Sequence, residues 1–458
     1  MATLTQTNKG KRCLVLENFK FREYYFSRIN NRIRWVCTAK SCTAEIFTDT
    51  DVNLLSSNLC HNHQPRTENV AEKQMFRVAC KRKALDDISQ RPSKIIRCEI
   101  SQSDDGIEVG DLKSGLRAIH YTRRKLYPTE PRDFVELHQA LDAFETVTTT
   151  GEQFLLENDI PSHVVIFSCK SNLELLCNPD VILLADGTFT YCPRLYLQLY
   201  TVHAFYNHHY LPLAFGLLPG KSAQVYRHFW SSIKRCAEET FNLTCSPKRV
   251  FFDFEAAAIS GFKEVFPDVP IKLCRFHLSQ SLYRKIGNLH LVENYKARDV
   301  MGKWLVMFFG LSLVTPEEVE DCYAFDIMPD LPDDDRTIAF ADYFLETYIH
   351  GSFPPHLWAE PPLEAVPRTT NGAEAFHSHF RNLFTHPHPG IFVFFDAITK
   401  IQSETYIKLR SIDTPKARRV EDVRKDHFAM QQYNRFQTGE TNRKEFLRII
   451  GNRLAPSN

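Results

Sequence analysis

The chain has 458 residues, 43% hydrophobic and 12% aromatic, which is enough to bury the cores of two or three domains. No apolar run approaches the ~20 residues that a membrane-spanning helix needs, and the polar segment Met1–Gly10 has the pattern of neither a secretory signal nor an anchor. The 13 cysteines are spread too widely for a disulfide scaffold, which favours buried thiols or metal ligands. We therefore expect a protein of the cytosol or nucleus that has no membrane partner.

Charge is distributed unevenly along the chain, although the net charge is only +1. Residues 1–100 carry 18 Lys and Arg against 10 Asp and Glu, or +8, which leaves −7 for the remainder. A basic N-terminal module on a mildly acidic body suggests a polyanionic partner such as nucleic acid.

This module contains four candidate metal ligands in two closely spaced pairs. The first pair is Cys37-x4-Cys42, and the second, 18 residues later, is His61-Asn62-His63. A segment of about 60 residues buries little apolar surface, so a tetrahedral zinc ion would stabilise it. The His-x-His pair differs from the His-x3–5-His of a ββα zinc finger. It therefore argues against a finger whose helix binds in the major groove of DNA. We expect a small aromatic core formed by Tyr24, Tyr25, Phe26, Trp35 and Phe47.

These positions carry a family resemblance. Phe19, Tyr25, Trp35, Cys37, Cys42, His61 and His63, in this order, resemble a FLYWCH zinc finger. The resemblance implies a small β-rich zinc-binding domain over residues 1–66. Two alternatives remain: the cysteines are core residues and the histidines belong to a polar loop, or Cys60 replaces one ligand.

Residues 67–150 are expected to form a basic helical connector. Ala71–Asp87 has helical composition with the cluster Lys81-Arg82-Lys83, Ile100–Asp111 is acidic and is interpreted as a flexible break, and Leu116–Leu126 is helical around Arg123-Arg124-Lys125. Each basic cluster is either a DNA-binding element or a solvated helix face.

From about residue 151 the sequence alternates between strand and helix patterns. Counted from Val181–Phe189, the expected order is three strands, a helix, a strand, a helix and a strand, which is the order of a ribonuclease H-like sheet. In such a sheet the first and fourth of these strands are neighbours. The expected strands are Val164–Cys169, Val181–Phe189, Tyr196–Phe205, Tyr210–Leu218, Arg249–Phe254 and Ile271–Phe276, and the helices are Gln224–Phe241 and Ala257–Phe266.

Two of these strands finish on an acid, at Asp186 and Asp253. An unpaired buried carboxylate is costly, so each must meet a backbone cap, a cation or a metal. Asp186-Gly187 is also a hairpin-turn signal, so a turn remains an alternative for this position. The repetition of the arrangement suggests one shared site.

The body resembles Mutator-like (MULE) transposases at Asp186-Gly-Thr-Phe189, Asp253-Phe-Glu255 and Cys274-Arg-Phe-His277. The resemblance implies a DDE enzyme with a ribonuclease H-like core over residues 151–400, interrupted by a helical insertion at about 278–367. The third acid would then be Glu374, since Thr369–His377 resembles the family's Asn-rich lead into its Glu. A capping box formed by Asn371 and Glu374 is the alternative, with Glu255 as the substitute acid.

Such a triad implies two Mg²⁺ or Mn²⁺ ions for phosphodiester cleavage, with Asp186 bridging both, Asp253 on one and Glu374 on the other. Cys274 and His277 are interpreted as a polar pair beside the catalytic strands, because two ligands do not make a metal site.

Residues 401–458 are expected to form a helical, basic C-terminal tail, whose Lys416-Ala-Arg-Arg419 either contacts phosphates or faces solvent. The zinc knuckle with which many Mutator-like transposases end is missing. We therefore expect a nuclear protein that binds double-stranded DNA, with a homo-oligomer possible. Two functions compete: a transposase, and a domesticated, non-catalytic regulator of transcription.

Overall fold

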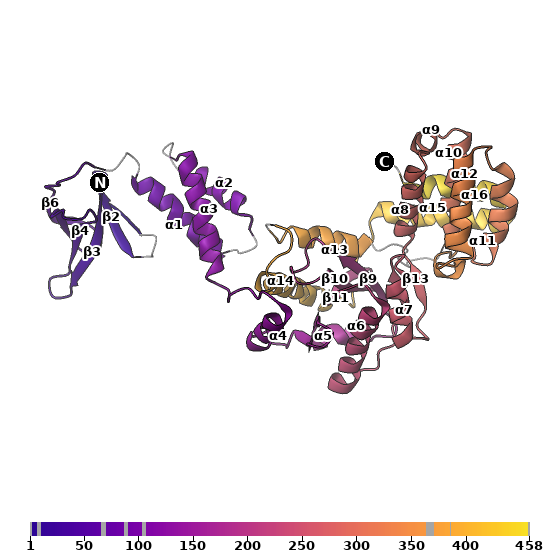
Figure 1. Ribbon diagram of the computed structural model, residues 1–458, viewed down its shortest axis with the longest axis horizontal. Helices are drawn as coiled ribbons and strands as arrows, with labels where there is room; N and C mark the ends of the chain where they lie inside the picture. The colour runs from indigo at the N-terminus through magenta and orange to yellow at the C-terminus, as the bar shows by residue number, and fades with distance from the viewer. Residues whose placement is uncertain are drawn as a thin grey trace. The chain divides into compact units, whose positions relative to one another are not determined.

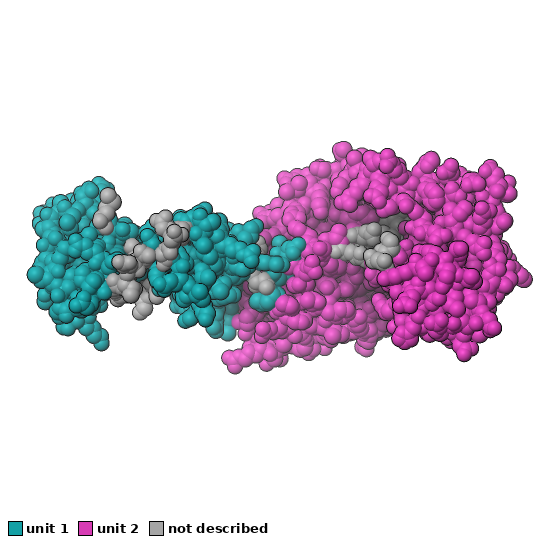
Figure 2. All heavy atoms as spheres, turned by 90° about the horizontal axis from the view of Figure 1, so that it is seen from above, with its two compact units in different colours: residues 1–129, 382–386 teal, residues 130–381, 387–458 magenta. Residues whose placement is uncertain are grey.

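A computed structural model describes residues 2–6, 11–65, 70–86, 90–102, 107–362, 371–384 and 386–456. The chain divides into two compact units, residues 1–129 with 382–386 and residues 130–381 with 387–458, coloured separately in Figure 2. Within the described ranges, no helix combines the length and the apolar character needed to cross a membrane.

Unit 1 begins with a six-stranded antiparallel sheet whose strands follow chain order (Figure 1). Alternate side chains on neighbouring strands face one core, where Phe21, Ile33, Trp35 and Ile46 are fully or almost fully buried. The indole Nε1 of Trp35 donates to Thr48 Oγ1 at 2.9 Å, so the buried ring leaves no unpaired donor. The strands are β1 (Thr3–Gln6), β2 (Arg12–Leu16), β3 (Phe19–Ser27), β4 (Arg32–Cys37), β5 (Glu45–Thr48) and β6 (Leu54–Asn58).

The expected aromatic core is wrong for four of its five members, since half-buried Phe47 also lies outside the buried cluster around Trp35. Tyr24 and Tyr25 are each 61% exposed and Phe26 is 38% exposed. The register of β3 against β4 shifts between Glu23 and Tyr25, and this irregularity interrupts the alternation that the sequence pattern assumed. Aliphatic side chains of β2, β4 and β5 fill the core beside Trp35 instead.

Three helices follow in unit 1, α1 (Val70–Asp86), α2 (Pro92–Ile100) and α3 (Val109–Arg124). They share a small core that includes Phe76, Ile95 and Ile119, so the described residues between Val70 and Arg124 are mostly helical, while the bounds of the connector stay a prediction. The expected break at Ile100–Asp111 falls partly on residues 103–106, which lie outside the described residues, and its last residues already belong to α3.

Part of the basic character of these helices holds them together. Lys83 on α1 forms an ion pair with Glu99 on α2 and a 3.0 Å hydrogen bond with Cys98 Sγ. Arg123 on α3 donates to the carbonyl of Gln90 at 2.7 Å. Two members of the basic clusters therefore link helices, while Arg82 is exposed.

Unit 2 is built on a seven-stranded mixed sheet in the order β13-β12-β9-β10-β11-β8-β7. β12 runs parallel to β9 and β13, and the other pairs are antiparallel. The strands that lead to the two acids are therefore neighbours, as expected. The last expected strand is shorter, because a helix already begins at Arg275. The strands are β7 (Leu155–Asp159), β8 (Val164–Phe167), β9 (Ile182–Thr188), β10 (Gln198–Tyr206), β11 (His209–Leu218), β12 (Arg249–Phe252) and β13 (Ile271–Leu273).

Helices cover both faces of this sheet (Figure 1). On one face α6 (Ala223–Arg235) packs on α7 (Ala256–Val265), where a Cβ on Gly261 would meet the Ala223 carbonyl oxygen at 2.6 Å. On the other face lie α13 (Asn371–Arg381) and α14 (Ile391–Leu409). The shorter α4 (Phe134–Ala143) and α5 (Lys170–Leu176) contact β7 and β11, respectively.

Register places Asp186 on the face of α13 and α14. Asp186, Thr201, Phe215 and Phe167 lie directly opposite one another across β9, β10, β11 and β8, so their side chains share a face. The ring centroid of Phe215 lies 6.0 Å from that of Phe376 on α13.

A helical group interrupts the chain between β13 and α13, and it confirms the expected helical character of the insertion as far as residue 362. Its α10 is almost wholly buried and packs on α16, whose Phe446, Leu447 and Ile450 belong to the main core. The C-terminal residues thus complete this group. The helices are α8 (Arg275–Asn288), α9 (Val292–Ala297), α10 (Val300–Gly310), α11 (Glu318–Asp321), α12 (Asp335–Phe344), α15 (Val420–Gln437) and α16 (Arg443–Leu454), with short 3₁₀ or π segments at Cys236–Thr240, Leu311–Leu313, Cys322–Ile327, Met328–Asp330, Leu345–Ile349 and Pro355–Leu357.

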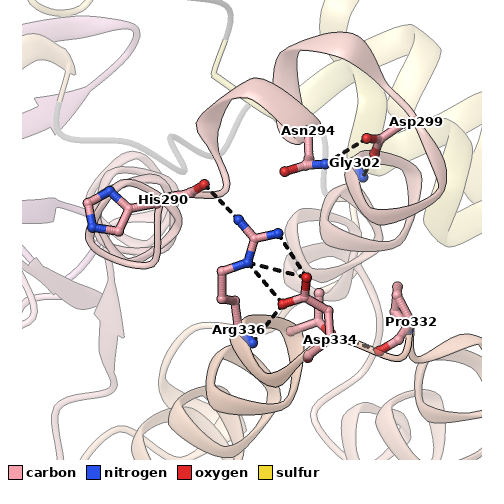
Figure 3. Close-up of polar contacts among 8 residues, drawn as sticks. His290, Asn294, Asp299, Gly302, Pro332, Asp334 and Arg336 are labelled. Atoms are coloured by element: carbon pink, nitrogen blue, oxygen red, sulfur yellow. Dashed lines mark hydrogen bonds and ion pairs between the residues drawn. The ribbon is translucent and has the colours of Figure 1, made fainter.

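Polar contacts tie the start of α12 to the end of α8 (Figure 3). Arg336 binds Asp334 through a two-pronged guanidinium contact, with Nη2 to Oδ2 at 2.8 Å, and donates to the His290 carbonyl at 3.2 Å. Nearby, Asp299 caps α10 by accepting from the backbone N–H of Gly302 at 2.9 Å.

Candidate functional site

The zinc ligands expected from the sequence converge in unit 1. The ligand atoms of Cys37, Cys42, His61 and His63 all lie within 4.8 Å of one another. Cys37 Sγ lies 3.2 Å from His63 Nε2, Cys42 Sγ lies 3.4 Å from His61 Nδ1, and the two ring nitrogens are 3.3 Å apart. A tetrahedral zinc would hold two nitrogens about 3.3 Å apart and sulfur and nitrogen about 3.6 Å apart. The donor set therefore fits structural zinc, and exposed Cys60 is not part of it.

Neighbouring groups orient the imidazole rings of His61 and His63 and favour metal binding. The ring of His61 stacks on Phe19 with centroids 3.5 Å apart, which gives the aromatic residue of the motif a physical role. His63 Nδ1 lies 2.9 Å from the Gln64 carbonyl and can donate to it, which leaves Nε2 free to face the cluster. Burial and the neighbouring His63 lower the pKa of His61, which favours the neutral form that binds metal.

The acidic pair lies in unit 2, on the α13 face of the sheet. Asp186 is on β9 and Asp253 directly follows β12. Leu184 and Phe251, two residues before each acid, belong to one small buried cluster, so the alternation of strand side chains sends both acids to the same side. The hairpin-turn alternative for Asp186-Gly187 is wrong, because β9 continues to Thr188 and Asp186 pairs with Thr201 on β10.

The two carboxyl groups influence each other. Burial raises the pKa of Asp253, and the Asp186 carboxylate, within hydrogen-bonding reach, raises it further. Burial acts to raise the pKa of Asp186, but the neighbouring imidazoles of His377, His277 and His203 together lower it, and the net shift is downward. Two close carboxylates on adjacent strands supply the hard oxygen donors that suit Mg²⁺ or Mn²⁺.

Each acid has an imidazole partner. His277 Nδ1 lies 2.5 Å from Asp253 Oδ1, and His377 Nε2 lies 3.0 Å from Asp186 Oδ2. Burial acts to lower the pKa of His277, but Asp253 and Cys274 together outweigh it and raise this pKa to about 11. The buried Cys274 precedes α8, and its backbone N–H bonds the Phe252 carbonyl at 2.9 Å. The interpretation of Cys274 and His277 as a polar pair beside the acid-bearing strands is confirmed.

The third acid is less defined. Glu374 lies in α13, three residues before His377, and its side chain is outside the described part of the structure, as is that of Asn371. Both its metal-ligand role and the capping box stay predictions. The substitute, Glu255, is held elsewhere: Tyr226 Oη donates to its Oε1 at 2.8 Å, and Lys221 Nζ lies 3.5 Å from its Oε2.

Sequence reasoning gave His377 no role, although it closes the Asn-rich segment that leads to Glu374. Its spacing from Glu374 was the available signal, since residues three apart share one side of a helix.

Comparison with known families agrees with this division of the molecule. A FLYWCH zinc finger domain model matches residues 4–63, and a MULE transposase domain model matches residues 182–281. A search of curated proteins found no match. The first match contains the Cys/His cluster, and the second contains Asp186, Asp253 and His277. The chain therefore joins a FLYWCH zinc finger domain to a MULE transposase domain, a combination that supports a transposase-derived DNA-binding protein.

Proposed function

We propose that this protein is a nuclear DNA transposase of the Mutator-like type, or a derivative that retains its chemistry. Unit 1 binds double-stranded DNA, and the acids of unit 2 cut DNA strands and join the freed 3′-hydroxyl to a target. The observation that carries the proposal is the close approach of Asp186 and Asp253 on adjacent parallel strands.

The topology of the sheet supports the catalytic half of the proposal. The order β11-β10-β9-β12-β13, antiparallel through the first three strands and parallel through the last two pairs, supports the proposal of a ribonuclease H-like core. In this reading Asp186 and Asp253 hold the divalent ions, and Glu374 is the third ligand from α13. The ions supply charge neutralisation on the attacking and leaving oxygens of the phosphodiester.

The protein's own residues would orient the reacting groups. His277 and His377 contact the acids from α8 and α13, one on each side of the helical insertion. These contacts hold the two carboxylates in place, and the same imidazoles can donate to phosphate oxygens.

The test measures metal binding and cleavage separately. Mn²⁺ binding to the full-length protein is followed by electron paramagnetic resonance, and nicking is followed on labelled DNA that carries terminal repeats. Asp186→Asn, Asp253→Asn and Glu374→Gln should each weaken Mn²⁺ binding and abolish nicking while DNA binding remains. The control, Asp268→Asn, changes an exposed carboxylate and should change neither. Full nicking by either Asp variant would refute the catalytic role.

One observation favours a second function, a domesticated DNA-binding regulator. Because each acid already contacts a histidine, both carboxylates have a partner within the protein without metal. A wild-type protein that binds DNA but neither binds Mn²⁺ nor nicks any end-bearing substrate would establish this regulator in place of the transposase.

A further inference from the structure

Arg275 is the first residue of α8, and its half-buried side chain makes no hydrogen bond or ion pair with any residue that the structure describes. It lies two residues before His277, on a different side of the helix. Burial lowers the pKa of Arg275, because its surroundings solvate the positive charge less well than water does. A partly buried cation without a partner is costly, so this position favours an anion.

The Arg275 side chain lines a hollow between α8, α15 and α16, and two further cations line the same hollow. Arg453 on α16 has its guanidinium carbon 6.0 Å from the centroid of the Phe428 ring and makes no ion pair within the described residues. Lys425 on α15 contacts Glu421 at 3.2 Å, but both side chains are more than half exposed, so that pair contributes little.

One carboxylate, Asp426, also lines the hollow among the described residues. It forms an ion pair with Arg418, which is not part of the lining. Asp426 favours the charged form of Arg275 electrostatically without contacting it. Among the described residues the lining therefore carries three cations and one acid that already has a partner, so the described lining is positively charged.

The remaining lining is apolar and includes Ala429, Ile450 and Leu454. These side chains offer the cations no acceptors and lower the local dielectric, which strengthens the attraction for an anion. Two guanidinium groups and an ammonium group match an anion with several oxygens and more than one negative charge.

We propose that the hollow lined by Arg275, Lys425 and Arg453 is a binding site for a phosphate group. The site is separate from the acidic pair, and it stands whether or not those acids cut DNA. The phosphate comes either from the backbone of bound DNA or from a free phosphate compound. In both cases the occupant contacts the first turn of α8, the turn that also presents His277 to Asp253.

The test uses equilibrium dialysis of the full-length protein against radiolabelled inorganic phosphate, with chloride holding the ionic strength constant. We expect saturable binding of one phosphate per chain. Arg275→Met keeps the length of the side chain and removes the charge, and it should weaken phosphate binding at least tenfold. The matched control is Arg227→Met, because Arg227 is an exposed arginine on α6 that pairs with Glu264 at 3.2 Å.

If circular dichroism shows that Arg275→Met does not fold, a second variant tests the same site. Arg453→Gln alters the opposite wall of the hollow and should also weaken binding. No saturable phosphate binding by the wild type, or unchanged binding in the folded hollow variants, would overturn the proposal.

Adding short duplex DNA then distinguishes the two sources. Displacement of labelled phosphate identifies a DNA backbone phosphate as the occupant. DNA that binds while labelled phosphate stays bound identifies a free phosphate compound. A protein that binds phosphate but no DNA supports this site and refutes the proposed function.

Discussion

A pair of buried amides should couple α5 to α14 on the acid-bearing side of the sheet. Asn172 Nδ2 donates to Gln402 Oε1 at 2.8 Å, and Gln402 Nε2 donates back to Asn172 Oδ1 at 2.8 Å. Both side chains are fully buried, and Asn172 also donates to the Leu213 carbonyl at 2.8 Å. Since water cannot replace these partners, removing either amide alone leaves the other unsatisfied.

The structure sets the size of each effect. Asn172→Leu removes both strong partners of Gln402, leaving a 3.5 Å contact with Cys169 Sγ, while the Leu213 carbonyl keeps its 2.8 Å bond from Ser168. At about 1–3 kcal/mol for each unsatisfied buried group, this variant should lose about 2–5 kcal/mol. Gln402→Met removes the hydrogen-bond donor of Asn172 Oδ1 alone and should lower the free energy of unfolding by about 1–3 kcal/mol.

The double variant, Asn172→Leu with Gln402→Met, removes both polar groups and should be more stable than the sum of the single losses predicts. Urea unfolding followed by tryptophan fluorescence measures this, because Trp230, Trp304 and Trp358 all lie in unit 2. Losses that simply add would mean that the two amides are not coupled, and the reasoning from reciprocal hydrogen bonds would be refuted.

Three further predictions concern unit 1. Chelation of zinc, or Cys42→Ser, should unfold the sheet, because structural zinc contributes roughly 10–16 kcal/mol of apparent free energy; unchanged chemical-shift dispersion in excess chelator would contradict this. Asp111 is buried, and although burial acts to raise its pKa, the backbone of Glu108 with Arg77 and Lys73 lowers it overall. Asp111→Asn should therefore destabilise α1–α3 at neutral pH, and its difference from wild type in urea unfolding should shrink as pH falls below about 4. Replacing Lys81 and Arg82 while keeping Lys83, which holds α2, should flatten the salt dependence of DNA affinity; an unchanged slope would place the DNA contacts elsewhere.

The sequence predicted the zinc cluster well because its ligands come in two close pairs, and each pair is brought together by local chain geometry. It also predicted that the strands leading to Asp186 and Asp253 are neighbours, since strand and helix periodicity determined their order. Periodicity failed at Tyr24 and Tyr25, where an irregular register in β3 exposes rings that the pattern assigned to the core.

Contacts between segments far apart in the sequence could not be predicted from strand and helix periodicity. The spacing of His377 from Glu374 put both residues on one side of a helix, but the contact with Asp186 also depends on where α13 returns to the sheet. The role of residues 401–458 was misjudged for the same reason. Phe446, Leu447 and Ile450 read as the apolar stripe of an ordinary amphipathic helix, and only the packing of α16 on α10 shows that they are core residues.

The packing of α16 on α10 has a consequence for synthesis of the chain. α10 is translated more than a hundred residues before α16, and α13 and α14 must join the sheet in between. While the ribosome extends the chain, the side of α10 that packs on α16 has no partner, and contacts of such long sequence separation form slowly. A message that ends before residue 443 would therefore leave Val306 and Gly310 without the helix that covers them and yield a product prone to aggregation, even though every acid of the proposed triad had been translated.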